Sequence, residues 1–131
     1  MSFVYCNPNP VRKTAGDCVV RGIAIIEDLT WDEAYDLISD HAKKHYDMPS
    51  ANWIVNSLLY SLGYVMIGLP SSCPHCYTVS DFADDHPSGI YLLGTGSHVV
   101  AVIHGDYYDT WNSGEEVPIY YWKKQNGGIS K

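Results

Sequence analysis

The stretch that decides the fold runs from Ala15 to Ile26 and reads AGDCVVRGIAII. Asp17 is a residue type that caps helices, so we expect a helix to begin near Cys18. The residues that follow are apolar on nearly every face, which predicts a buried helix. A helix N-terminus favours a thiolate because its backbone N–H groups are unpaired and its dipole end is positive. The stretch therefore predicts a nucleophilic cysteine on a buried helix.

Composition and charge bound the class of protein. The chain has 131 residues, of which 46% are hydrophobic and 18% charged, as is typical of a globular domain. We expect a single domain over residues 1–131, with a loop at 1–15 and a flexible tail at 125–131. The net charge of -7 argues against a nucleic-acid partner. No apolar run reaches the ~20 residues of a membrane span. The first residues lack the features of a secretory signal, so we expect a cytoplasmic protein with mostly reduced cysteines.

Helix signals come before strand signals along the chain, which indicates an α+β fold. Capping residues and helical spacing predict three more helices: from Thr30 through Lys44, opened by a capping box with Glu33, from Ser50 or Asn52 to Gly63, and from Ser80 to Asp85. Runs of β-branched and aromatic residues predict strands at 64–69, 89–93, 98–103, 107–112 and 117–122. Short turns separate the last four strands. We therefore expect N-terminal helices packed on a C-terminal antiparallel sheet whose other face is half-exposed.

His98 opens one of these strands and is the candidate base for Cys18. A hairpin loop at 104–106 makes the numbers of opposed residues sum to 210, which places Asn112 beside the imidazole. A two-residue loop at 105–106 places Ser113 there instead. In either register Asp109, the alternative orienting residue, is too far along the strand, roughly 13 Å in the second case. A three-residue loop with a left-handed residue and a bulge is common, and Gly105 or Asp106 can supply that residue, so we prefer Asn112.

These residue types suit nucleophilic catalysis. His98 would take the thiol proton of Cys18 and later protonate the leaving group, while Asn112 would fix the orientation of the ring. The developing oxyanion needs hydrogen-bond donors. One is the backbone N–H of Cys18, and a second is expected from the preceding loop, where the candidates are Asn7, Asn9, Arg12 and Lys13. The sequence does not choose among them.

Three segments carry a resemblance to a known family: Gly16-Asp17-Cys18-Val19-Val20-Arg21, Ser97-His98-Val99-Val100-Ala101-Val102 and Tyr108-Asp109-Thr110-Trp111-Asn112. In this order they resemble the papain-like cysteine peptidase superfamily, and more narrowly small cysteine-peptidase-like proteins of bacteria and their phages. The resemblance spans about residues 16–122 and implies a papain-like fold around the Cys18 helix. It implies that Cys18 is the nucleophile, His98 the general base and Asn112 the orienting residue. At the position where members usually carry a glutamine lining the oxyanion hole, this chain has Arg12.

The expected activity is hydrolysis of an amide or isopeptide bond in a peptide or protein, through a thioester on Cys18 and without a cofactor. Two alternatives share the fold: an amidase that cuts peptidoglycan peptides, and a catalytically inactive binding module, such as a phage protein acting on a host factor. The sequence does not indicate the oligomeric state.

The motif Cys73-Pro74-His75-Cys76 belongs to a different class of function. A CxxC pair can provide half of a zinc site or act as a redox couple. Cys73 and Cys76 are therefore weak metal-ligand candidates, because no second pair at similar spacing exists. The alternative is a surface loop with two unreactive thiols.

Overall fold

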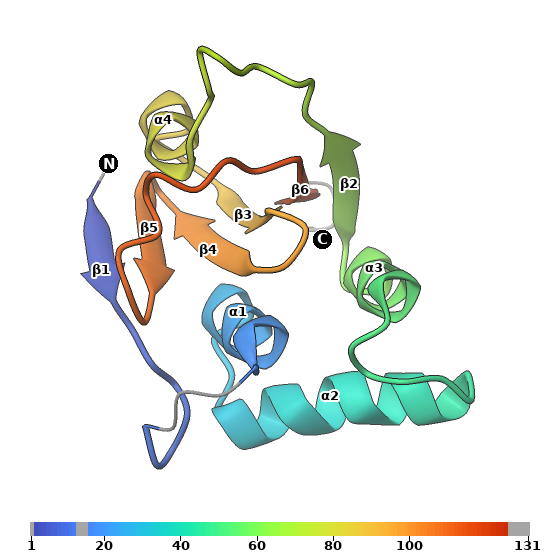
Figure 1. Cartoon of the computed structure of the whole chain (residues 1–131). Helices are drawn as coiled ribbons and strands as arrows, with labels where there is room; N and C mark the ends of the chain where they lie inside the picture. The colour runs from blue at the N-terminus through green and yellow to red at the C-terminus, as the bar shows by residue number, and fades with distance from the viewer. Residues whose placement is uncertain (1, 13–15, 126–131) are drawn as a thin grey trace.

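The computed structural model describes residues 2–12 and 16–125. It is an α+β structure in which four helices surround a mixed sheet of six strands (Figure 1). The helices are α1 (Cys18–Ile26), α2 (Trp31–Lys44), α3 (Asn52–Ser61) and α4 (Val79–Asp85). The strands are β1 (Phe3–Tyr5), β2 (Tyr64–Gly68), β3 (Ile90–Gly94), β4 (Val99–Ile103), β5 (Asp106–Asp109) and β6 (Tyr120–Lys124).

The order of strands in the sheet is β1-β5-β4-β3-β6-β2. The predicted antiparallel meander is correct for β3, β4 and β5. It is wrong for the last strand, because β6 crosses over to lie between β3 and β2, antiparallel to both. The prediction of a plain loop at 1–15 is also wrong in part, because residues 3–5 form β1, which pairs parallel to β5. The tail predicted at 125–131 lies outside the described residues except for Gln125, whose backbone N–H donates to Gly63 O.

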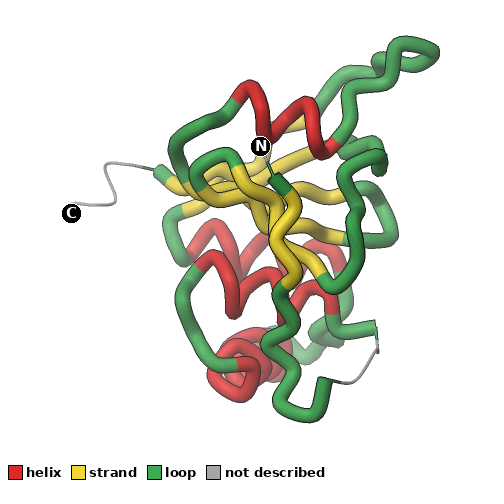
Figure 2. The backbone as a smooth tube through the Cα atoms, turned by 90° about the vertical axis from the view of Figure 1, so that its left-hand side faces the viewer, coloured by secondary structure: helices red, strands yellow, loops and turns green. Residues whose placement is uncertain are grey.

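Helices cover both faces of the sheet. Helices α1, α2 and α3 lie on one face and α4 on the other (Figures 1 and 2). Each face has its own hydrophobic core: Ile23 and Leu92 belong to the first, and Phe82 and Val100 to the second. Residues 91–94 and 99–102 are therefore buried on both sides. The expected half-exposed sheet is corrected here, because α4 covers the face that the meander would have left open. None of the helices in the described part of the chain is long and apolar enough to cross a membrane.

Capping explains where the helices begin. The predicted capping box at Thr30 and Glu33 is confirmed. Helix α4 begins at residue 79 rather than 80, because Thr78 and Asp81 form a second capping box. Helix α3 is preceded by Ala51, with no side-chain cap from either predicted residue. Sequence spacing located these helices well and their terminal residues less well.

Helix α1 lies close against the sheet because residue 22 has no side chain. A Cβ atom at Gly22 would be 2.7 Å from Leu92 Cδ1 and 3.4 Å from Val99 Cγ2. Interiors are packed too densely to absorb such an overlap without movement of the helix. The glycine therefore sets the spacing between α1 and the strands β3 and β4. That spacing fixes how far Cys18, at the start of α1, lies from the first residues of β4.

Candidate active site

Cys18 is the first residue of α1, and its half-buried side chain packs against the beginning of β4. The His98 ring and the backbone N–H of Val99 both interact with its sulfur. Burial alone would raise the pKa of Cys18, but hydrogen bonding to these two groups outweighs burial. The pKa of Cys18 therefore lies below its ordinary value of 9.0. This is the shift that a nucleophilic thiol requires.

His98 directly precedes β4 and forms the centre of the site. Its Nε2 atom is 2.6 Å from Asp109 Oδ2, so its other ring nitrogen is the one available to Cys18. Hydrogen bonding to Asp109, with a further contribution from Cys18, raises the pKa of His98 from 6.5 to about 9. The ring centroid of the half-exposed Trp111 lies 5.3 Å from that of His98. Below about pH 9 the imidazole is therefore held in its charged form beside a thiol whose pKa is lowered.

Asp109, at the end of β5, is the residue that orients His98. Its side chain is buried and accepts hydrogen bonds from His98 and Ser113 on Oδ2 and from the backbone N–H of Thr110 on Oδ1. Burial would raise the pKa of Asp109, but the hydrogen bonds from His98 and Ser113 hold it below the ordinary value. A carboxylate with three donors is well fixed in position. The structure therefore brings together Cys18, His98 and Asp109.

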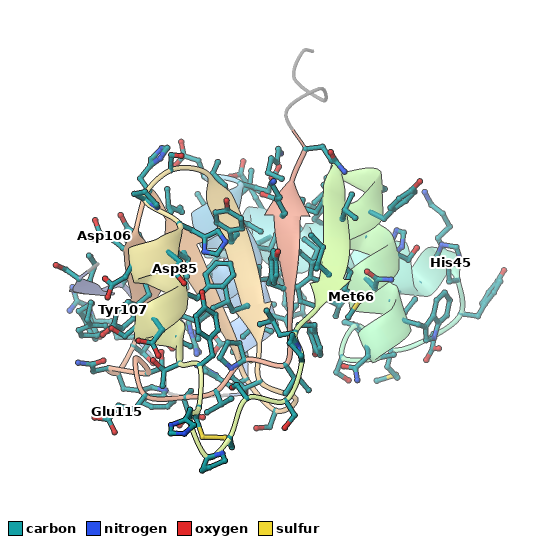
Figure 3. The ribbon with its side chains drawn as sticks, turned by 90° about the horizontal axis from the view of Figure 1, so that it is seen from above. His45, Met66, Asp85, Asp106, Tyr107 and Glu115 are labelled. Carbon is teal, nitrogen blue, oxygen red and sulfur yellow. A yellow bond between two sulfur atoms is a disulfide. The ribbon has the colours of Figure 1, made fainter. Side chains whose placement is uncertain are left out.

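Asn112, the predicted orienting residue, does not reach His98, and this prediction is corrected. Its Oδ1 atom accepts hydrogen bonds from the Tyr107 hydroxyl and from the backbone N–H of Gly114, both at 3.0 Å. It therefore holds the turn after β5. Tyr107 is labelled in Figure 3, beside α4 and on the same side of the molecule as Asp106.

The error came from the hairpin register. Ile103 pairs with Asp106 and Val102 with Tyr107, so opposed residue numbers sum to 209 and the loop is His104-Gly105. Both loop residues have positive φ, 50° and 84°, as a tight two-residue hairpin turn requires. Positive φ is uncommon for a residue other than glycine, and the two loops weighed from the sequence, 104–106 and 105–106, both placed the left-handed residue at Gly105 or Asp106. In the true register Asp109 is a diagonal neighbour of the position opposite His98, within reach of its side chain.

The expected oxyanion candidates in the loop before α1 form hydrogen bonds within this loop and to Asp17. Asn7 Oδ1 accepts the backbone N–H of Asn9, and Asn9 Nδ2 donates to Asp17 Oδ2 at 3.1 Å. Arg12 has a positive φ of 53° and donates its backbone N–H to Asn9 O. None of these three residues lines the cavity at Cys18. Lys13, the fourth candidate, lies outside the described residues.

Asp17 was predicted as the helix cap, yet its side chain makes no capping hydrogen bond. Its carboxylate instead pairs with Arg21 and accepts the indole N–H of Trp31 at 2.9 Å. Burial would raise the pKa of Asp17, but hydrogen bonds from Asn9 and Trp31 and the charge of Arg21 lower it. The residue before the nucleophile is thus fastened to α1, to α2 and to the preceding loop. Arg21 and Trp31 are parts of the site that sequence reasoning missed.

A cavity of about 380 Å³ lies in front of the sulfur. Cys18 and His98 form one part of its lining, and apolar side chains, among them Trp31, Ile38 and Tyr120, form much of the rest. Trp31 and Tyr35 are stacked, with ring centroids 5.1 Å apart, at the side formed by α2. Concave sites with a few polar groups among apolar walls are the usual form of pockets that bind small molecules.

The CxxC motif forms a disulfide, and it lies away from this cavity. Cys73 and Cys76 are bonded to each other in the loop between β2 and α4, where the bond is visible as a yellow stick in Figure 3. The expectation of mostly reduced cysteines is therefore wrong for this pair, and both sulfurs are occupied. In the described part of the chain no group of three or more His, Cys, Asp or Glu side chains is arranged to hold a metal ion. The free cysteines are Cys6 and Cys18.

No family model, curated protein or solved structure matches this chain. The function must therefore be argued from the site itself.

Proposed function

We propose that this protein is a thiol hydrolase that cleaves an amide or isopeptide bond in a peptide or protein. The observation that carries the proposal is the hydrogen-bonded series Cys18, His98 and Asp109 at the wall of a cavity. A thiol with a lowered pKa, a base beside it and a carboxylate behind the base are the parts that nucleophilic acyl transfer requires. The resemblance to papain-like peptidases is retained as an expectation, with Asp109 in the orienting role in place of Asn112.

The proposed reaction uses the charges already present. The Cys18 thiolate adds to the carbonyl carbon, the resulting oxyanion collapses, and the His98 imidazolium gives its proton to the leaving amine. A thioester on Cys18 remains. His98, now neutral, removes a proton from water as the water attacks the thioester, which releases the acid and restores the Cys18 thiolate and the His98 imidazolium. No cofactor takes part in these steps.

The free thiol of Cys18 is compatible with a reducing compartment, so we propose the cytoplasm as its location. Disulfides are rare there, so the bond between Cys73 and Cys76 counts against this location.

Alkylation by iodoacetamide tests the proposal. At pH 6 a thiol with the ordinary pKa of 9.0 is only about 0.1% thiolate. Cys18 should therefore react many times faster than a free thiol at this pH. Cys6 is an internal control in the same molecule, because burial raises its pKa. Peptide mapping by mass spectrometry separates the two sites.

Two histidine variants complete the test. His98→Ala should slow the alkylation of Cys18 at pH 6 at least tenfold, because the imidazolium that stabilises the thiolate is lost. His75→Ala, at an exposed position in the disulfide loop, is the matched control and should change nothing. If Cys18 reacts no faster than Cys6, the protein is not a thiol hydrolase, and the non-catalytic binding module becomes the better interpretation.

A further inference from the structure

Strand β6 presents two neighbouring tyrosines to opposite faces of the sheet. Tyr120 packs in the core beneath α1, and Tyr121 packs against Phe82 under α4. The alternation follows from strand geometry, since successive side chains point to opposite faces. Because β6 crosses over to pair with β3, residue 120 lies opposite Gly94, and Gly94 in turn pairs with Val99 at the start of β4. The crossover thus carries Tyr120 to the end of the sheet where His98 lies.

Gly94 provides the space that the Tyr120 ring occupies. A Cβ atom at residue 94 would be 2.1 Å from Tyr120 Cε1 and 2.6 Å from Cζ, much closer than any atoms tolerate. The ring therefore lies directly over the backbone of β3 and leans toward β4. Trp122 lies against its other side, edge to face, with centroids 5.2 Å apart. The ring has little freedom to move.

The phenol group of Tyr120 lies in the catalytic cavity. Tyr120, Cys18 and His98 line the same cavity. Burial raises the pKa of Tyr120, and the negative charge of the Cys18 thiolate raises it further, so the hydroxyl stays protonated. Its only polar atom, the hydroxyl oxygen, forms no hydrogen bond with the residues that the structure describes. A fixed O–H donor without a partner, beside a nucleophile, is suited to a charge that exists only during reaction.

We propose that Tyr120 is a catalytic residue whose hydroxyl donates a hydrogen bond to the oxyanion formed at Cys18. This inference rests on the proposed hydrolase function and identifies a second oxyanion donor, since Asn7, Asn9 and Arg12, the candidates among the described residues, do not line the cavity. The backbone N–H of Cys18 is the first donor. No proton moves to the oxygen, so the phenol acts only by hydrogen bonding.

An activated ester, p-nitrophenyl acetate, isolates the step. The Cys18 sulfur forms a bond to the carbonyl carbon, and the C=O π pair moves onto oxygen as the oxyanion that Tyr120 faces. The pair then returns, the bond to the p-nitrophenyl oxygen breaks, and p-nitrophenolate leaves with the negative charge. The product is an acetyl thioester on Cys18. Its formation is followed by the absorbance of p-nitrophenolate and by the mass of the acylated protein.

The decisive variant is Tyr120→Phe, which keeps the ring and removes the hydroxyl. Loss of one oxyanion donor typically lowers the rate about 10²- to 10³-fold, so we expect acylation to slow by at least tenfold. Iodoacetamide alkylation of Cys18 should not change, because displacement at a saturated carbon forms no oxyanion. Tyr121→Phe, the adjacent tyrosine on the opposite face, is the matched control and should leave both rates unchanged. Cys18→Ala provides the background, and thermal unfolding checks that each variant is folded.

Each other outcome overturns the inference in a distinguishable way. If Tyr120→Phe acylates as fast as the wild type while Cys18 remains highly reactive, Tyr120 is only a wall of the cavity and the hydrolase proposal stands. If alkylation and acylation slow equally, Tyr120 supports the thiolate and not the oxyanion. If the wild type acylates no faster than Cys18→Ala, the proposed function and this inference fail together.

Discussion

Replacement of Asp109 by asparagine removes the negative charge of the orienting residue and keeps the size and shape of its side chain. Asp109 is the largest cause of the rise in the pKa of His98 from 6.5 to about 9. A carboxylate in contact with an imidazole typically accounts for about 1–3 pKa units. In Asp109→Asn we therefore expect the His98 pKa to fall to about 7. At pH 8 the protonated fraction of His98 would then drop from about nine-tenths to about one-tenth.

The hydrogen bonds of Asp109 predict that Asp109→Asn loses more activity than the loss of its negative charge alone would cause. The carboxylate accepts from His98 and Ser113 on one oxygen and from the Thr110 N–H on the other. An amide has one oxygen, so if that oxygen keeps the Thr110 N–H, the NH₂ group faces His98 and requires Nε2 to accept. The proton then moves to the ring nitrogen that faces Cys18, where it prevents the ring from acting as a base. A wrong tautomer of this kind can cost about 10⁴-fold in rate.

The assay is the rate of Cys18 alkylation from pH 5 to 10, together with acylation by p-nitrophenyl acetate. We expect the rise of alkylation with pH to move to higher pH, and acylation at pH 8 to fall at least tenfold. Asp106→Asn is a control on the same strand, because that carboxylate accepts the backbone N–H of Ser2 at the other end of β5. Identical pH profiles for a folded Asp109→Asn and the wild type would refute the view that Asp109 orients and charges the ring.

Three further results are expected. In the wild type, hydrolysis needs the Cys18 thiolate and the His98 imidazolium, so kcat/KM should rise as Cys18 ionises at a pH below 9.0 and fall as the pH passes about 9. A plateau of kcat/KM continuing well above pH 9 would contradict the assignment of His98. Asn112→Ala should lower the free energy of unfolding by about 1–2 kcal/mol, because the hydrogen bonds from Tyr107 and Gly114 are lost. The rate of Cys18 alkylation should stay within about twofold of the wild type. Slower alkylation of Cys18 would return Asn112 to the catalytic role. Cys76→Ser should lower the free energy of unfolding in urea by about 2 kcal/mol at most, because the disulfide closes a short loop. Any loss of Cys18 reactivity in this variant would show that the disulfide loop supports the active site.

The sequence was most informative where the signal is local. The capping box at Thr30, the apolar run behind Cys18 and the glycine-separated strands all have short-range causes, and each predicted the correct type of element. The placement of Cys18 and His98 side by side also followed from their order along the chain. The types of these elements could therefore be predicted without knowledge of the tertiary structure.

The features that the sequence did not reveal depend on contacts between distant segments. The identity of the orienting residue turned on a one-residue difference in hairpin register, which a histidine with positive φ at position 104 decided. The crossover of β6 placed Tyr120 in the site, and no local pattern near residue 120 marks that crossover. Strand β1 has only three residues, and it exists because β5 offers it an edge.

Strand β1 has a consequence for how the protein is made. Ser2 and Asp106 are hydrogen-bonded across 104 residues of sequence, and the backbone N–H of Cys6 donates to the carbonyl oxygen of Asp109. Pairings between such distant segments form late, because closing a long loop costs entropy before any contact rewards it. The segment through residue 109 must therefore leave the ribosome before the carboxylate behind His98 is anchored. A nascent polypeptide carries Cys18 long before it carries His98 and Asp109, so the thiol should become reactive only after synthesis has passed residue 109.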